Sequence, residues 1–308
     1  MQRLAQPLLI FIVGPTAIGK SEIACLLAAK INAEIVSCDS MQIYKGMEII
    51  TSKPDLASRK KIAHHLMGVV SVDKEYDVSR YRKEAVKKIK EIIGRERIPV
   101  FVGGTGLYMS VLIDGIFNLK PPSRDIRINL YKQAEALGIQ KLYARLEKVD
   151  SEAAQKIHPH DAKRIIRALE VFESAGESIS SLQKQRKGLA QEYSVRVFGL
   201  NMAREKLYAR INTRTEDMFQ RGLVKEVKRL LKLKLSKTAA YAIGIREIKG
   251  YLDGEYDLDE AKRLIQRNTR IYAKRQFTWF RKDKRIEWVE ISDNDKPEEV
   301  VSRILQRF

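Results

Sequence analysis

One segment, residues 14–21 with the sequence GPTAIGKS, constrains the fold of this chain more than any other. It fits the phosphate-loop pattern G-x-x-x-x-G-K-[ST] at every fixed position. The apolar residues 8–13 before it are typical of a buried parallel strand. After it, apolar residues recur at helical spacing, at Ile23, Ala24, Leu26, Leu27 and Ile31. This succession of strand, glycine-rich turn and helix predicts an α/β protein with an anion-binding loop at the edge of a parallel sheet.

Each fixed position of this loop has a chemical reason. Gly14 and Gly19 let several backbone amides point inward at one anion, and the helix that follows adds its positive N-terminal end. Lys20 supplies a mobile charge, and the hydroxyl of Ser21 can bind Mg²⁺. A chance match in a strand–turn–helix unit is the structural alternative. The predicted phosphate-binding residues are Gly14, Pro15, Thr16, Ala17, Ile18, Gly19, Lys20 and Ser21, with Ser21 as the predicted metal ligand.

The charge balance indicates a large polyanionic partner. In 308 residues, 58 Lys and Arg outnumber 39 Asp and Glu, which gives a formal net charge of +19. One small phosphate ligand does not require this excess, whereas a nucleic acid does. A charge-rich surface like those of thermophiles is the alternative, but such surfaces carry both signs more evenly. We therefore expect an RNA or DNA partner.

Cysteine usage and the start of the sequence favour the cytoplasm. Cys25 and Cys38 give no disulfide framework and lie in or beside apolar segments. Residues 1–7 are too few for a signal peptide, and residues 8–13 are too few to span a bilayer. We expect a cytoplasmic protein that does not associate with membranes, and a monomer.

A polar segment follows the next apolar run. Residues 33–38 predict a second strand, which delivers Asp39, Ser40, Met41 and Gln42 at its C-terminal end. Ligands bind beyond the C-termini of strands in open parallel sheets, so Asp39 should lie near the phosphate loop. Its carboxylate could act as a general base or hold Mg²⁺ through water. Asp is also a good helix cap, and the sequence leaves both roles open.

A third predicted strand, residues 98–102, runs into a second glycine-rich turn at residues 103–106. A motor ATPase would carry an acidic residue at this strand end to hold metal and activate water. Glycines and Thr105 stand there instead. The hydroxyl and free amides suit a phosphate or a leaving group, and a purely structural turn is the alternative.

The pattern changes near residue 116. Residues 119–123, LKPPS, predict a linker, and mostly helical segments follow. Residues 195–200 predict a strand that returns to the sheet. We therefore expect a core of residues 1–115 and 195–308 and a helical insertion of residues 116–194. A predicted helix from Asp161 in the insertion carries Lys163, Arg164 and Arg167 near its start, which could clamp a nucleic-acid backbone.

A long predicted helix near the C-terminus, residues 260–282, carries a second group of basic residues. Arg263, Arg267, Arg270 and Lys274 recur at intervals of four, three and four, so they share one face. Arg with interleaved aromatics suits phosphate contacts and base stacking. The stripe favours RNA or DNA contact, whereas the aromatic side chains are expected to pack inward.

Together these segments resemble the tRNA dimethylallyltransferase family, also called isopentenyl-tRNA transferases. The similarity covers nearly the whole chain and depends on the order and spacing of the motifs. The matching residues are 14–21, 39–44 (DSMQIY), 52–54 (SKP), 102–108 (VGGTGLY), 164–171 and 269–281. The resemblance implies a P-loop NTPase-like core, with a parallel sheet flanked by helices and a mostly helical inserted domain.

The resemblance also implies an activity. The family transfers a dimethylallyl group from dimethylallyl diphosphate to N6 of adenosine 37, next to the tRNA anticodon, and releases diphosphate. The donor diphosphate would occupy the phosphate loop with Mg²⁺ as cofactor. Lys20, Asp39 and Thr105 correspond to catalytic positions, and Asp39 would take the N6 proton. Implied tRNA contacts are Asp39, Ser40, Met41, Gln42, Arg127, Lys163, Arg164, Ile165, Ile166, Arg167, Arg263, Arg267, Arg270 and Lys274.

Three other functions compete with this hypothesis. A nucleotide kinase shares the loop and the sheet but leaves the charge of +19 unexplained. A GTPase switch should carry the guanine motif Asn-Lys-x-Asp, which the sequence lacks. Related prenyltransferases act on free adenylate, whereas the basic helices favour tRNA.

Overall fold

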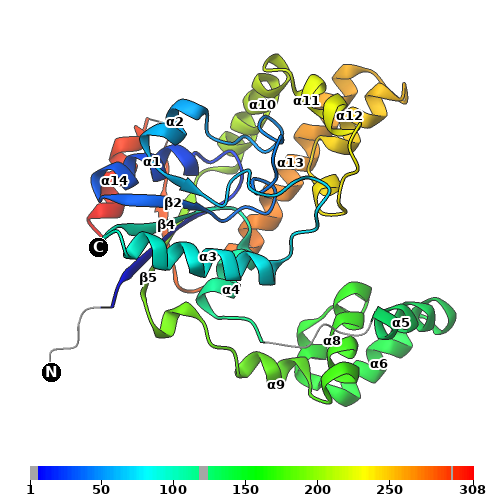
Figure 1. Ribbon diagram of the computed structural model, residues 1–308. Coiled ribbons are helices and arrows are strands. Elements are labelled where there is room, and N and C mark those ends of the chain that lie inside the picture. Colours follow the sequence, from blue (N-terminus) through cyan, green and yellow to red (C-terminus); the bar gives the residue numbers. More distant parts are fainter. Residues whose placement is uncertain (1–5, 118–123, 293) are drawn as a thin grey trace, which may run out of the picture. The chain divides into compact units, whose positions relative to one another are not determined.

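The computed structural model describes residues 6–117, 124–292 and 294–308, and the expected linker at 119–123 lies outside them. The chain divides into two compact units, drawn in Figure 1. The first consists of Met1–Ile113 and Leu189–Phe308, and the second of Asp114–Gly188. The second unit is shorter than the expected insertion of residues 116–194, because the short 3₁₀ helix η1 (Leu189–Gln191) packs against the first unit.

A parallel sheet forms the centre of the first unit. Within the described residues its six strands have the order β3-β2-β4-β1-β5-β6. They are β1 (Leu8–Val13), β2 (Ala33–Ser37), β3 (His64–His65), β4 (Ile98–Gly103), β5 (Ser194–Asn201) and β6 (Ile286–Glu290). Ile10 of β1 pairs with Val100 of β4 on one side and Arg196 of β5 on the other. Because all pairs are parallel, the carboxyl ends of the strands meet at one edge of the sheet.

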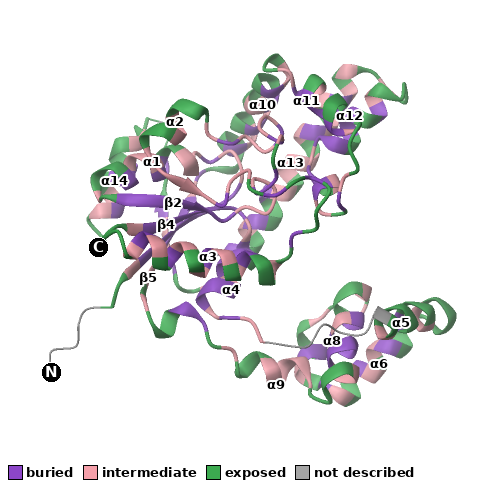
Figure 2. Cartoon of the chain, in the orientation of Figure 1, coloured by how far each residue is buried: buried purple, intermediate pink, exposed green. Residues whose placement is uncertain are grey.

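Helices cover both faces of this sheet. One face packs against α1 (Lys20–Lys30) and α14 (Pro297–Leu305), and the other against α3 (Val78–Ile93) and α4 (Gly106–Ile113). Figure 2 shows the strands as buried between these layers. The buried residues of α3 are Tyr81, Ala85, Ile89 and Ile92, as the helical spacing predicts. The small helix α2 (Leu56–Lys61) begins after the capping residue Asp55.

A second helical group belongs to the same unit. It contains α10 (Arg204–Gln220), α11 (Leu223–Leu230), the 3₁₀ helix η2 (Ala239–Tyr241), α12 (Ile245–Leu252) and α13 (Leu258–Phe280). Helix α13 contacts α10, α12 and α4, so it reaches from this group to the sheet. Of the helices in the described ranges, none is long and apolar enough to cross a membrane.

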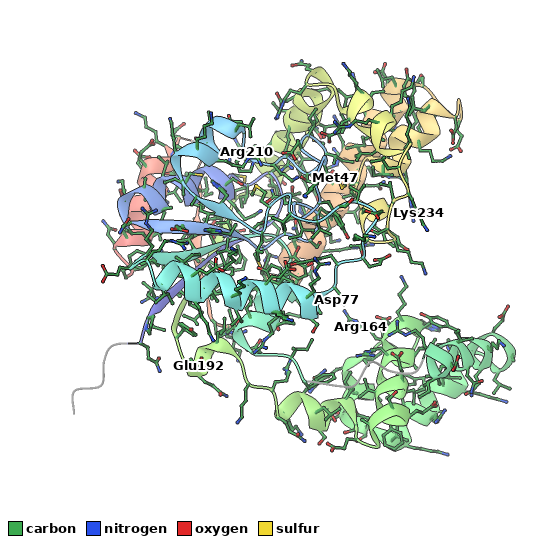
Figure 3. The ribbon with its side chains drawn as sticks, in the orientation of Figure 1. Met47, Asp77, Arg164, Glu192, Arg210 and Lys234 are labelled. Atoms are coloured by element: carbon green, nitrogen blue, oxygen red, sulfur yellow. The ribbon has the colours of Figure 1, made fainter. Side chains whose placement is uncertain are left out.

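The second unit has its own core. It consists of α5 (Arg124–Leu137), α6 (Ile139–Val149), α7 (Ser151–Lys156), α8 (Ala162–Ala175) and α9 (Ile179–Lys184). Ile165 and Ile166 of α8 lie in this core and are 0% and 1% exposed. Their assignment as tRNA contacts is therefore corrected: these side chains hold α8 in place, and its first turn exposes Lys163 and Arg164 instead. Figure 3 labels Arg164 on this helix.

Candidate active site

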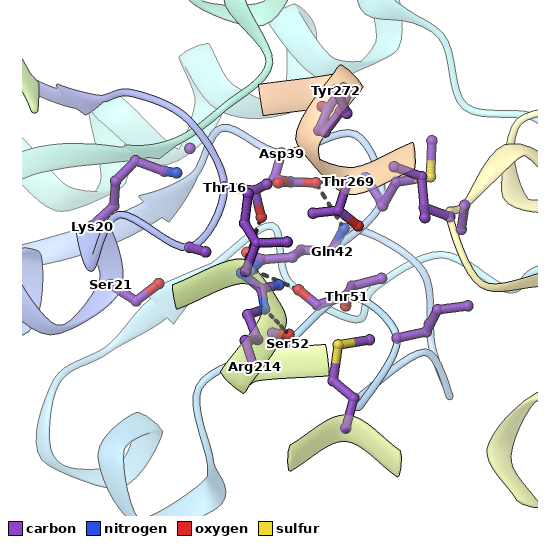
Figure 4. Close-up of a pocket in the computed structure, with 18 of the residues that line it drawn as sticks. Thr16, Lys20, Ser21, Asp39, Gln42, Thr51, Ser52, Arg214, Thr269 and Tyr272 are labelled. Carbon is purple, nitrogen blue, oxygen red and sulfur yellow. Dashed lines mark hydrogen bonds between the residues drawn. The ribbon is translucent and has the colours of Figure 1, made fainter. Parts of the chain in front are cut away.

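A cavity of about 620 Å³ lies in the first unit where β1, β2 and β4 end. Figure 4 shows that its labelled side chains come from segments distant in sequence. The phosphate loop, the segment after β2, helix α10 and helix α13 all contribute to the wall. Polar wall residues include Thr16, Lys20, Ser21, Asp39, Ser40, Gln42, Ser52, Arg214, Thr269, Tyr272 and Gln276. The sequence predicted that the loop and Asp39 would meet at this edge, and both line the cavity.

The phosphate loop curls as its glycines allow. Gly14 and Gly19 have φ angles of 143° and 98°, in the region that favours glycine. Ile18 is 0% exposed and packs in the core, so it anchors the loop and does not line the cavity. The Nζ of Lys20 donates to the Pro15 carbonyl oxygen at 2.7 Å, which bends the side chain back over the loop. Of the eight predicted residues, Thr16, Ala17, Gly19, Lys20 and Ser21 line the cavity.

Burial is the largest influence on the ionisation of Lys20. It lowers the pKa of the ammonium to about 8, an effect that Asp39 opposes and Arg214 reinforces. An anion bound in the loop would favour the charged form and raise this pKa again. The cavity therefore holds a cation that a polyphosphate would stabilise.

Asp39 caps the turn after β2 and also lies where a ligand could reach it. Its Oδ1 accepts hydrogen bonds from the backbone amides of Met41 at 2.9 Å and Gln42 at 3.3 Å, so it caps the turn after β2. The same residue lines the cavity with the phosphate loop. Capping through Oδ1 fixes the carboxyl group and leaves Oδ2 for a ligand.

The second glycine-rich turn is shaped by close packing. A Cβ at Gly104 would lie 2.0 Å from Nε2 of Gln276, and one at Gly106 would lie 2.1 Å from the ring of Trp279. Both residues belong to α13, so the turn consists of glycines where this helix lies against it. Thr105 supports the wall from behind: its Oγ1 accepts from the Ser40 amide at 3.0 Å. The structural alternative for this turn therefore explains its glycines.

Arg214 is the most important wall residue that sequence reasoning missed. Its Nη1 donates to Oγ1 of Thr16 at 3.0 Å, and its Nε donates to Oγ of Ser52 at 2.8 Å. Burial lowers the pKa of Arg214, and the carboxylate of Asp39 opposes this effect. A signal was present, because Arg214 lies seven residues after the buried Leu207, on the apolar stripe of α10. A charge at such a position requires a partner or a ligand.

The predicted basic stripe of α13 divides into two kinds of residue. Arg263, Arg267 and Lys274 are exposed, and Arg263 also pairs with Glu260. Arg270 turns toward α10, where its Nη1 donates to Oδ1 of Asn212 at 3.2 Å. Arg270 therefore stabilises helix packing and is less available to a nucleic acid than the other three.

Arg127 has a defined partner in the second unit. Its Nε and Nη2 donate to the two carboxylate oxygens of Glu170, each at 2.8 Å, and Arg167 also binds Glu170. Burial of Glu170 opposes ionisation, yet the two guanidinium groups hold its pKa below the usual value. Arg127 and Arg167 thus stabilise an almost fully buried carboxylate, and both keep part of their surface exposed.

A glycine-rich loop between a parallel strand and a helix, with a lysine and a hydroxyl at its end, defines a P-loop-type α/β protein. Comparison with known proteins gives the family. Residues 42–283 match the family model for IPP transferase. The chain belongs to this family, which confirms the resemblance found in the sequence.

Individual relatives agree along the chain. It is 45% identical over 302 residues to a tRNA dimethylallyltransferase of Carboxydothermus hydrogenoformans, covering 96% of each chain. It is 44% identical over 308 residues to one of Natranaerobius thermophilus, covering 97% of this chain and 92% of the relative.

Solved structures share the fold. The full-length tRNA isopentenylpyrophosphate transferase of Bacillus halodurans matches with a TM-score of 0.70 and 36% identity, over 98% of this chain and 96% of that one. A eukaryotic dimethylallyltransferase acting on tRNA matches with a TM-score of 0.82 and 28% identity, over 97% of this chain and 77% of that one.

Proposed function

We propose that this protein transfers a dimethylallyl group from dimethylallyl diphosphate to N6 of adenosine 37, next to the anticodon of tRNA. Its relatives carry the name tRNA dimethylallyltransferase. The observation that carries the proposal is that one cavity holds both a phosphate loop and the Asp39 carboxylate. The loop supplies a site for a leaving diphosphate, and the carboxylate supplies a proton acceptor.

The donor diphosphate binds in the loop. Thr16 and the loop amides contact its oxygens, while Lys20 and Arg214 bring positive charge to the same wall. These groups stabilise the negative charge that develops on the diphosphate as it leaves. Oxygen ligands and phosphates suit Mg²⁺, so the Ser21 hydroxyl would hold this ion, which when bound supplies further charge neutralisation.

The transfer exchanges one bond for another. The bond between C1 of the dimethylallyl group and the diphosphate oxygen breaks, and its electron pair leaves with the diphosphate. A bond from N6 to C1 forms, and the N6 proton passes to the carboxylate of Asp39. An aromatic amine is a weak nucleophile, so alignment by the fixed Asp39 contributes more than proton removal does.

The acceptor adenine must leave the base stack of the tRNA before its N6 can approach C1 of the dimethylallyl group. Ser40, Met41 and Gln42 line the cavity beside Asp39 and form the wall for the adenine. Exposed Arg267 and Lys274 of α13 contact the phosphates of the tRNA, and Lys163 and Arg164 of the second unit contact its anticodon arm. We propose that the protein acts as a monomer in the cytoplasm, and its free cysteines accord with a reducing compartment.

Mass spectrometry tests this function. Unmodified tRNA is incubated with the protein, Mg²⁺ and dimethylallyl diphosphate, then digested to nucleosides. We expect adenosine 37 to gain one dimethylallyl group in place of one hydrogen. Unchanged adenosine in every tRNA would refute the proposal, and phosphate transfer in a parallel incubation with ATP would identify a kinase instead.

A further inference from the structure

Gln276 joins two loops of the candidate active site through one side chain. Its Oε1 accepts from the backbone amide of Thr16 at 2.8 Å, and its Nε2 donates to the carbonyl oxygen of Gly104 at 2.9 Å. The residue is 5% exposed and lines the cavity. A primary amide is the group that can accept on one side and donate on the other.

The connection continues to the acceptor side of the cavity. Gly104 precedes Thr105, whose hydroxyl accepts from the amide of Ser40. Ser40 in turn follows Asp39, the proposed proton acceptor. The chain of contacts therefore runs from the phosphate loop through Gln276 to the loop that carries Asp39.

Gln276 also belongs to the helix that presents the exposed basic residues. Arg267, Lys274 and Arg275 of α13 are exposed, while Gln276 is buried on another side of the same helix. A rigid helix transmits a small shift from one face to the other, because its backbone hydrogen bonds prevent it from deforming locally. Contact of RNA with α13 would thus act on both loops together.

We propose that Gln276 is a positioning residue that aligns the donor loop with the acceptor loop and links this alignment to RNA bound on α13. The inference rests on the proposed function for its choice of substrates. Gln276 touches no reacting atom in this scheme. It acts through the Thr16 amide and the Gly104 carbonyl.

The first test replaces the amide by an apolar chain of similar length. Gln276→Met keeps volume but removes both hydrogen bonds, so kcat/KM for dimethylallyl diphosphate should fall about 10- to 100-fold. The dissociation constant for tRNA should stay within about twofold of wild type, because the exposed residues are intact. Gln266→Met on the same helix is the matched control and should leave both quantities unchanged. An unchanged kcat/KM, or equal losses in donor and tRNA binding, would overturn the proposal.

The second test uses protonation. In Gln276→Glu the ionised carboxyl can accept from Thr16 but has no proton for Gly104, whereas the neutral acid restores both bonds. Burial favours the neutral acid, so the variant to wild-type ratio of kcat/KM should rise as pH falls from about 8 to about 6. Tyr272 on the same helix, Lys20, Asp39 and Arg214 also face this cavity, and they are common to both proteins. A ratio independent of pH would contradict the role of the Gly104 bond.

A binding measurement separates this inference from the proposed function. Calorimetry with Mg²⁺ and inorganic pyrophosphate needs no turnover, and it should show weaker binding to Gln276→Met than to wild type. If wild type binds pyrophosphate more tightly than Gln276→Met does but never modifies tRNA, the proposed function is refuted and the positioning role of Gln276 is not. If wild type modifies tRNA and both Gln276→Met and Gln276→Glu bind pyrophosphate and turn over normally, the role of Gln276 is refuted and the proposed function is not.

Discussion

Arg214 and Thr16 are 198 residues apart in sequence, yet Nη1 of the first donates to Oγ1 of the second at 3.0 Å. The guanidinium also donates to Ser52 through Nε, so it bridges the phosphate loop and the loop that carries Ser52. This planar fork places positive charge where a leaving diphosphate would develop negative charge.

Replacing Arg214 by lysine tests the fork. Arg214→Lys keeps the charge but cannot hold Thr16 and Ser52 with the same geometry, so kcat/KM for dimethylallyl diphosphate should fall about 10- to 100-fold. Steady-state kinetics at saturating tRNA measures this change in kcat/KM. Arg204→Lys, an exposed change at the start of the same helix, is the control. Equal kinetics for the two variants would show that charge alone suffices.

Asp39→Asn separates the two roles of this residue. The amide oxygen can still cap the turn at Met41 and Gln42, but the neutral side chain no longer serves as proton acceptor. Single-turnover rates should fall about 100-fold or more, while binding of tRNA and pyrophosphate is retained. Asp77→Asn, at the cap of α3, controls for the loss of one carboxylate. A near-normal rate would exclude Asp39 from proton transfer.

Donor binding should depend on pH through Lys20. Its pKa of about 8 in the free protein lies below the usual value because of burial, so the ammonium is lost as pH rises through 8. The bound diphosphate favours the charged form, so binding above this pH requires proton uptake and weakens by up to about tenfold per pH unit. Calorimetry with pyrophosphate between pH 6.5 and 9.5 measures the effect. In Lys20→Arg the weakening of pyrophosphate binding above pH 8 should disappear. If the variant and wild type show the same pH profile, the pH dependence comes from the ligand alone.

Glu226 of α11 should support the cavity from outside. Its carboxylate accepts from the backbone amides of Glu48, Ile49 and Ile50, at 2.9 to 3.1 Å, and so orders the loop that carries Ser52. Glu226→Gln should lower the free energy of unfolding by about 1–3 kcal/mol, because the neutral amide replaces an ionised acceptor. Denaturant titration measures the loss, and the exposed Glu255→Gln is the control. Equal stability of the two variants would contradict this role.

Salt dependence should identify the RNA-facing residues of α13. Arg267 and Lys274 are exposed, whereas Arg270 is engaged with Asn212. Replacing Arg267 and Lys274 together by Gln should reduce the slope of log K against log salt for tRNA by about 1.4 to 1.8. The single change Arg270→Gln should alter this slope less. A larger change in slope for Arg270→Gln than for the double variant would place the RNA on the side of α13 that faces α10.

The sequence predicted the parts that depend on local order. The phosphate loop and Asp39 follow strands, and parallel strands deliver their ends to one edge, so their meeting could be foreseen. The contacts of Gln276 could not be predicted from the sequence, because nothing near residue 276 specifies which loops its side chain will reach. The same limit explains Ile165 and Ile166: a motif gives their sequence position, but only the packing of α8 shows that they are buried.

The bond between Gln276 and Thr16 has a consequence for biosynthesis, since the two residues are 260 positions apart. The ribosome makes the phosphate loop among the first residues and the helix that completes its support near the end of translation. The strand β5, which flanks β1, also emerges only after the entire second unit. Nascent chains that end before residue 276 should therefore lack a complete donor site. The enzyme should become able to bind its donor only near the end of translation.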